Sequence, residues 1–203
     1  LPEQLFSFRS RDPLTLVHET SNGVALGSSY CAAAAYSLFE FIERDAFLTF
    51  WHKQVPLRRI DNASLSPDQQ EIIRSFETEH KKVYLFDLRF DIAIPTVLSL
   101  VVSEQEKPAT YVSAAAHLDG NIAIEGALKE AVVAHNVYRN NKPVASQAYT
   151  GQEAVPTLSD HFDFYARPEA GRAYDFRLRA QGTFAPSELF PPTPSRPGRA
   201  LLS

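Results

Sequence analysis

The residues best suited to chemistry lie in the stretch 37–47, which reads S-L-F-E-F-I-E-R-D-A-F. On a helix, Glu40, Glu43 and Arg44 share one face, because residues three and four apart are neighbours. Mg²⁺ is held by one or two carboxylates together with phosphates, and arginine binds a phosphate through two parallel hydrogen bonds. A Mg²⁺-nucleotide site is therefore one hypothesis for this stretch. The alternative is a solvated stripe with an intrahelical ion pair, which contributes only about 0.3–0.5 kcal/mol.

A nucleotide would have to bind here without either familiar phosphate loop. The sequence contains neither G-x-x-x-x-G-K-[S/T] nor G-x-G-x-x-G. Both motifs use glycine to bring backbone N–H groups close to phosphates. The carboxylates and the arginine of the 37–47 stretch would have to hold the Mg²⁺ and the phosphates instead.

The helix that must carry these residues is predicted over about residues 30–52. Ser28 and Ser29 can cap its start, and Pro56 ends it. Residues 1–27 are predicted to be extended segments and loops, with a turn at Asn22-Gly23. The apolar residues of the helix fall on most of its sides, which is typical of a buried helix. They are Leu38, Phe41, Ile42, Ala46, Leu48, Phe50 and Trp51.

The rest of the chain predicts an α+β fold in which long helices pack on a mainly antiparallel sheet. A second helix begins at the capping sequence S-P-D-Q, and a third begins at Asn121. Apolar periodicity gives the other elements. The predicted helices cover 66–81, 121–140, 157–166 and 170–179, and the predicted strands cover 83–88, 95–102 and 109–116. One domain is expected over 1–180, followed by a proline-rich, extended or disordered tail over 181–203.

Composition excludes several classes of protein. With 203 residues, of which 44% are hydrophobic, the chain can form a sizeable core, so it is neither disordered nor collagen-like. A net charge of −4 gives no case for nucleic-acid binding, and no apolar run approaches a membrane span of ~20 residues. The single cysteine, Cys31, favours a reducing, cytoplasmic setting. The chain starts at Leu1 and lacks Met, and we interpret it as an internal piece of a longer protein.

Two stretches resemble the signature of the YcaO family. Residues 20–27, T-S-N-G-V-A-L-G, match its S-N-G-x-A-x-G pattern, and residues 40–46, E-F-I-E-R-D-A, match its E-x-x-E-R-D-A helix. Weaker matches follow in order at 91–95 (D-I-A-I-P), 127–131 (A-L-K-E-A) and 160–165 (D-H-F-D-F-Y). The last of these resembles a segment of the branch that makes thiazoles and oxazoles in peptides. The resemblance covers about residues 14–178 and implies a YcaO-like but incomplete domain.

The resemblance implies an ATP-dependent cyclodehydratase that phosphorylates a backbone amide of a ribosomally made precursor peptide. Attack by Cys, Ser or Thr on that amide would close an azoline ring, and sulfide would give a thioamide instead. By resemblance, Glu40, Glu43, Arg44 and Glu130 bind ATP, and Glu40 and Glu43 hold Mg²⁺. The implied partners are the precursor peptide and a leader-peptide-binding protein or domain, with no nucleic acid and no membrane. A homodimer is left open.

Some positions depart from the family pattern. Ala32 stands where an acidic residue usually lies two turns before Glu40, and Val133 replaces a glutamine three residues after Glu130. The family domain is also nearly twice as long as this chain. These departures favour an alternative function, a non-catalytic YcaO-like module that binds a peptide or a partner subunit. The intact carboxylates favour an enzyme for the parent protein, with the isolated chain inactive.

Overall fold

The computed structural model describes residues 21–103, 109–140 and 164–191. The chain divides into two units, and the boundary between Phe41 and Ile42 falls inside helix α1 (Tyr30–Lys53). Residues 21–41 are the described part of the first unit, and the other described residues belong to the second.

The first unit contains a tight turn followed by the start of α1. Val24 N–H donates to the Ser21 carbonyl at 3.1 Å, and Gly23 lies at the turn with φ of 76°. The predicted Asn-Gly turn is therefore confirmed. Ser29 caps the helix, because its Oγ accepts from the Ala32 N–H at 3.2 Å.

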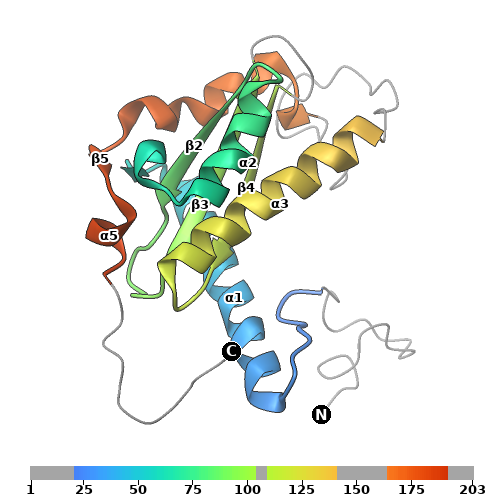
Figure 1. Ribbon diagram of the computed structural model, residues 1–203, viewed down its shortest axis with the longest axis vertical. Helices are drawn as coiled ribbons and strands as arrows, with labels where there is room; N and C mark the ends of the chain where they lie inside the picture. The colour runs from blue at the N-terminus through green and yellow to red at the C-terminus, as the bar shows by residue number, and fades with distance from the viewer. Residues whose placement is uncertain (1–20, 104–108, 141–163, 192–203) are drawn as a thin grey trace. The chain divides into compact units, whose positions relative to one another are not determined.

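The second unit is built on a five-stranded sheet with the order β4-β3-β2-β1-β5 (Figure 1). The strands are β1 (Arg58–Ile60), β2 (Lys81–Asp87), β3 (Thr96–Ser103), β4 (Thr110–Ala116) and β5 (Thr183–Phe184). All neighbours pair antiparallel except β1 and β5, which are parallel. The predicted α+β class with a mainly antiparallel sheet is confirmed.

Both faces of this sheet are buried. Side chains of a strand alternate between faces, so Val83 and Leu85 of β2 pack toward one core and Phe86 toward the other. Helices α2 (Pro67–Glu77) and α3 (Gly120–Asn140) cover the first face and lie in front of the strands in Figure 1. The end of α1 and the 3₁₀ segment η4 (Pro168–Arg179) cover the second face, where Phe50 contacts Phe176.

Helix α2 begins as its sequence predicts but ends earlier. Ser66 Oγ accepts from the Gln69 N–H at 3.4 Å, and Gln69 Oε1 accepts from the Ser66 N–H at 3.1 Å. This is the predicted capping box. The helix stops at Glu77 rather than near residue 81, because His80 adopts a left-handed φ of 57° and Lys81 already pairs in β2.

Helix α1 is less buried than its apolar composition suggests. Leu38, Phe41 and Leu48 expose 60%, 52% and 53% of their surface, so the expectation of a helix buried on most sides is wrong for these positions. The last part of the helix packs on the sheet, through Ala46 and Phe50. None of the helices in the described ranges combines the length and apolar character of a membrane span.

The second unit continues past the boundary expected at residue 180. Arg59 N–H donates to the Gly182 carbonyl at 3.1 Å, and Asp61 N–H donates to the Phe184 carbonyl at 2.8 Å, which adds β5 to the sheet. The short helix α5 (Pro186–Leu189) follows, and Leu189 and the next residue, Phe190, are buried in the core under α2 and α3. Residues 183–184 are extended as expected, but they belong to the sheet, whereas residues 186–189 are helical and not extended or disordered. Residues 192–203 lie outside the described ranges.

The structure describes two of the three remaining predicted helices. The helix predicted at 157–166 falls largely outside the described residues, and the one predicted at 170–179 is the second part of η4. The helix predicted at 121–140 is α3. Strands β1 and β5 and the short 3₁₀ segment η2 (Asn62–Ser64) are additional to the prediction.

Candidate functional site

In the first unit, Glu40 is bonded to the turn that precedes its own helix. Its Oε2 accepts a hydrogen bond from the Gly23 N–H at 2.9 Å. Ser37, one turn earlier on α1, donates from Oγ to the Gly23 carbonyl at 2.6 Å. Both backbone polar groups of Gly23 are therefore bonded to side chains of α1. This contact joins the S-N-G stretch to the first glutamate of E-x-x-E-R-D-A.

Glycine is required where the turn approaches the helix. A Cβ atom on Gly23 would lie 2.3 Å from Cε2 of Phe41, and its φ of 76° is in the left-handed region that disfavours side chains. A Cβ on Gly27 would lie 2.3 Å from the backbone nitrogen of Ala33. The two glycines of S-N-G-x-A-x-G thus allow the chain to pass closely along the start of α1.

In the second unit, the other predicted site residues come from two helices. Glu43 is half-buried and Arg44 is exposed on α1, and Glu130 is exposed on α3. The packed end of α1 and α3 cover opposite faces of the sheet. A site that uses side chains from both helices therefore has to be assembled around the margin of the sheet.

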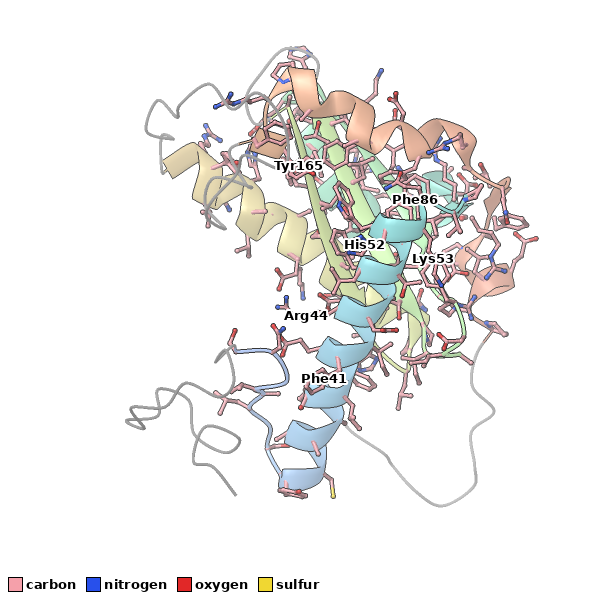
Figure 2. All side chains as sticks on the ribbon, turned by 180° about the vertical axis from the view of Figure 1, so that it is seen from behind. Phe41, Arg44, His52, Lys53, Phe86 and Tyr165 are labelled. Carbon is pink, nitrogen blue, oxygen red and sulfur yellow. The ribbon has the colours of Figure 1, made fainter. Side chains whose placement is uncertain are left out.

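Figure 2 looks onto the face of the sheet that α1 covers. Arg44 lies two turns before His52 and Lys53 along the helix, and Phe86 belongs to the sheet beneath it. The fully buried Phe86 packs with α1 residues such as Phe50 in one core. This packing anchors the end of α1 and leaves Arg44 on an exposed part of the helix.

The second unit also has a small recess beside the last part of α1. It is formed by α1, the loop after β2 and the start of β3, and its lining residues are Ile42, Asp45, Ala46, Arg89, Phe90, Asp91, Ile92 and Thr96. The structure thus brings E-R-D-A together with the D-I-A-I-P stretch. Sequence reasoning did not single out Asp45 or Arg89 as site residues. Their positions inside or beside these motifs were the available signal.

One wall of the recess is fixed by a buried carboxylate. Asp87, whose side chain is fully buried, forms ion pairs with Arg58 and with Arg89, the latter at 2.9 Å from Nε to Oδ1. Arg89 Nη2 also donates to the Leu189 carbonyl at 2.6 Å, and its guanidinium lies 4.7 Å from the ring centre of Phe190. The pairing satisfies the buried charge. Arg89 thereby joins the recess to α5.

The donor chemistry of the E-x-x-E-R stretch fits Mg²⁺ with a nucleotide. The described residues contain no group of three or more His, Cys, Asp or Glu placed to hold a metal ion. Mg²⁺ does not need such a group, because one or two carboxylates suffice when phosphates and water complete its octahedron. Glu40 and Glu43, one turn apart on α1, would supply that number of carboxylates, and Arg44 would supply a phosphate ligand.

A model of the YcaO family, described as YcaO cyclodehydratase, ATP- and Mg²⁺-binding, matches residues 1–197. This chain belongs to the YcaO family. The match includes both signature stretches and every residue named above for the site. The family resemblance stated from the sequence is confirmed.

Individual relatives are more distant. An uncharacterized protein of Methanothermobacter thermautotrophicus is 25% identical over 164 residues, which are 77% of this chain and 42% of that protein. A heterocyclase in complex with substrate and cofactor matches with TM-score 0.66 and 23% identity over 83% of this chain and 23% of the other. YcaO from Methanopyrus kandleri, bound with AMPPCP and Mg²⁺, matches with TM-score 0.61 and 18% identity over 83% and 41%. These structural matches establish the YcaO fold, and the chain spans less than half of each relative.

Proposed function

We propose that this chain contributes the Mg²⁺- and ATP-binding helix of a cyclodehydratase that forms azolines in a ribosomally made peptide. The observation that carries the proposal is the E-x-x-E-R stretch on α1, with Glu40 bonded to the S-N-G turn, in a chain of this family. Support comes from the related M. kandleri protein bound with AMPPCP and Mg²⁺ and from a heterocyclase bound to substrate and cofactor.

Each residue has a role that its chemistry suits. Glu40 and Glu43 would hold Mg²⁺, and Arg44 would pair with phosphate oxygens and offset their negative charge. Glu130 would add an acidic group from α3. When bound, ATP supplies the phosphoryl group that makes the amide oxygen a leaving group. The protein's work is then to position charges, which is the main contribution of proteins to phosphoryl transfer.

The peptide and its partners are also part of the proposal. The substrate would present a Cys, Ser or Thr whose side chain attacks the amide carbon next to it, and sulfide in its place would give a thioamide. A leader-peptide-binding protein or domain would deliver the precursor. A solved relative, the E. coli microcin synthetase McbBCD complex with pro-MccB17 bound, supports this arrangement, with TM-score 0.59 and 17% identity.

A second function is favoured by two positions, one on α1 and one on α3. Ala32 is 5% exposed, so the position where the family usually has an acidic residue carries only a buried methyl group here. Val133, on α3, is 57% exposed and cannot donate the hydrogen bonds of a glutamine. The alternative is a YcaO-like module that binds a peptide or a partner subunit without binding a nucleotide.

Mg²⁺-dependent stabilisation by AMPPCP separates the two functions. A ligand that binds only the native state stabilises it by about 2.7 kcal/mol at a hundredfold excess over Kd. In a thermal-shift titration of the complete protein, we expect AMPPCP to raise Tm only with Mg²⁺ present. E43Q should remove most of this shift because it loses a charge and keeps its shape. R44K should reduce it because a lysine cannot form the two parallel bonds.

Two surface residues of α2 provide matched controls. Arg74 and Glu71 form an exposed i,i+3 pair of the same residue types, at 2.6 Å. E71Q and R74K should leave the Mg²⁺-dependent shift unchanged. A wild-type protein with no such shift at millimolar AMPPCP would rule out the nucleotide site and leave the binding module.

A further inference from the structure

We propose that the Gly23 backbone and the Ser37 hydroxyl position the Glu40 carboxylate for Mg²⁺. Ser37 is then a positioning residue, since it acts on the ion only through Gly23 and Glu40. The inference rests on the proposed function, because it deepens the role of the same helix. All three residues belong to the first unit.

The contacts form a continuous chain of hydrogen bonds. Ser37 Oγ donates to the Gly23 carbonyl at 2.6 Å, which fixes the orientation of that residue. The Gly23 N–H then donates to Glu40 Oε2 at 2.9 Å. Since Ser37 and Glu40 are one turn apart on α1, the helix holds both ends of this chain.

This arrangement suits a metal-binding carboxylate. A glutamate side chain loses much rotamer freedom when it is fixed, and Mg²⁺ requires near-ideal octahedral geometry. A carboxylate already held by a backbone N–H has met part of that entropy cost before the ion binds. Carboxylates that bind metals commonly accept such a hydrogen bond from a neighbouring group, and the loss of that neighbour weakens metal binding.

The turn is built so that its amide can reach the helix. The Val24 N–H closes the turn on the Ser21 carbonyl at 3.1 Å, and Gly23 adopts its φ of 76°. The ring of Phe41 occupies the place of a Cβ on residue 23, at 2.3 Å. With glycine at this position, the backbone N–H can reach the Glu40 carboxylate. A larger residue would hold that N–H away from the carboxylate.

The test measures Mg²⁺ binding directly. In the complete protein with AMPPCP present, isothermal titration of Mg²⁺ onto S37A should give an apparent Kd raised roughly five-fold, the effect of one lost hydrogen bond. S37T retains the hydroxyl and should restore the wild-type Kd. The matched control is S29A, which removes the Ser29 Oγ bond to the Ala32 N–H on the same helix. S29A should leave the Kd for Mg²⁺ unchanged.

Two further variants keep the outcomes distinguishable. In E40Q the amide oxygen can still accept from the Gly23 N–H, but the charge is lost, so Mg²⁺ binding should disappear. If E40Q and E43Q both bind Mg²⁺ as the wild type does, the proposed function itself fails. If E40Q loses Mg²⁺ while S37A behaves like S29A, only the positioning role is overturned. An equal loss in S37A and S37T would also overturn it, because the hydroxyl would then be irrelevant.

Discussion

At the scale of the residue, Gly23 occupies a conformation and a space that together exclude a side chain. We expect G23A to destabilise the protein by about 1–3 kcal/mol, the cost of a residue held in an unfavourable backbone conformation. The close approach to Phe41 adds to this cost. Chemical denaturation of the complete protein measures the loss. G171A is the control, because a Cβ there has no atom within 4 Å. Equal losses in the two variants would contradict the steric argument.

Spacing rules explain which site residues the sequence could predict. The E-x-x-E-R stretch was found because helical neighbours lie three and four residues apart. The bond between Gly23 and Glu40 joins residues 17 apart in the chain, and no periodicity predicts such a pair. The pairing of Asp87 with Arg58 is similar, because it depends on the antiparallel register of β1 and β2. Contacts of this kind can be identified only when the fold is known.

At the scale of the element, Glu79 links three parts of the second unit. It forms ion pairs with Lys81 at 2.6 Å and with Arg139 at 3.2 Å, and its Oε2 lies 3.0 Å from His135 Nε2. These contacts join the end of α2 to β2 and α3. The hydrogen bond from Lys81 is the main cause that lowers the pKa of Glu79 below its ordinary value. The ion pairs therefore favour the charged carboxylate.

The lowered pKa of Glu79 gives a pH dependence with a definite sign. A carboxyl with a lower pKa in the folded state stabilises the fold above its unfolded pKa, near 4.3, and loses this contribution as pH falls through the folded value. Wild-type protein should therefore lose more stability than E79Q between pH 6 and pH 3, measured by denaturant unfolding at each pH. E77Q, on the same helix end, is the control. Parallel pH profiles for wild type and E79Q would contradict this linkage.

Arg89 connects the β2–β3 loop to α5, and its removal should loosen that element. In R89A, α5 loses a hydrogen bond to the Leu189 carbonyl and the contact with the Phe190 ring. Buried Asp87 loses one of its two arginines, and breaking one buried pair costs up to about 3–5 kcal/mol. Hydrogen exchange should become faster at residues 183–190, and R74A should not change it. Unchanged protection there would show that β5 and α5 are held by packing alone.

The elements that sequence predicted well are the long ones. The capping box of α2 and the apolar runs of β2 and β3 are local signals, and the structure agrees with them. Strand β1 has three residues and β5 has two, which is too short for a period to be seen. Residues 182–190 are folded because β5 pairs with β1 and Leu189 is buried. Prolines there do not prevent folding, because Pro186 opens a helical turn.

At the scale of the whole molecule, apolar residues were not a reliable guide to burial. Val133, Val137 and Ile122 expose 57%, 48% and 48% of their surface on α3, even though the opposite side of that helix is fully buried. A sequence pattern identifies an apolar face but not the part of a protein that covers it. The relatives are more than twice as long as the segment that this chain matches.

The apolar residues on the exposed side of α3 should affect how this chain behaves by itself. The 203-residue polypeptide, produced by itself, should bind a hydrophobic dye or self-associate, because soluble monomers rarely expose large contiguous apolar patches. The double variant V133S/V137S should reduce dye fluorescence and self-association. Its free energy of unfolding should stay within about 0.5 kcal/mol of the wild-type value, the usual range for surface substitutions. N136S, at an exposed polar position on the same helix, is the control. A wild-type polypeptide that is monomeric, binds no dye and melts cooperatively would indicate instead that α3 needs no covering partner, and that the chain is stable with this side in water.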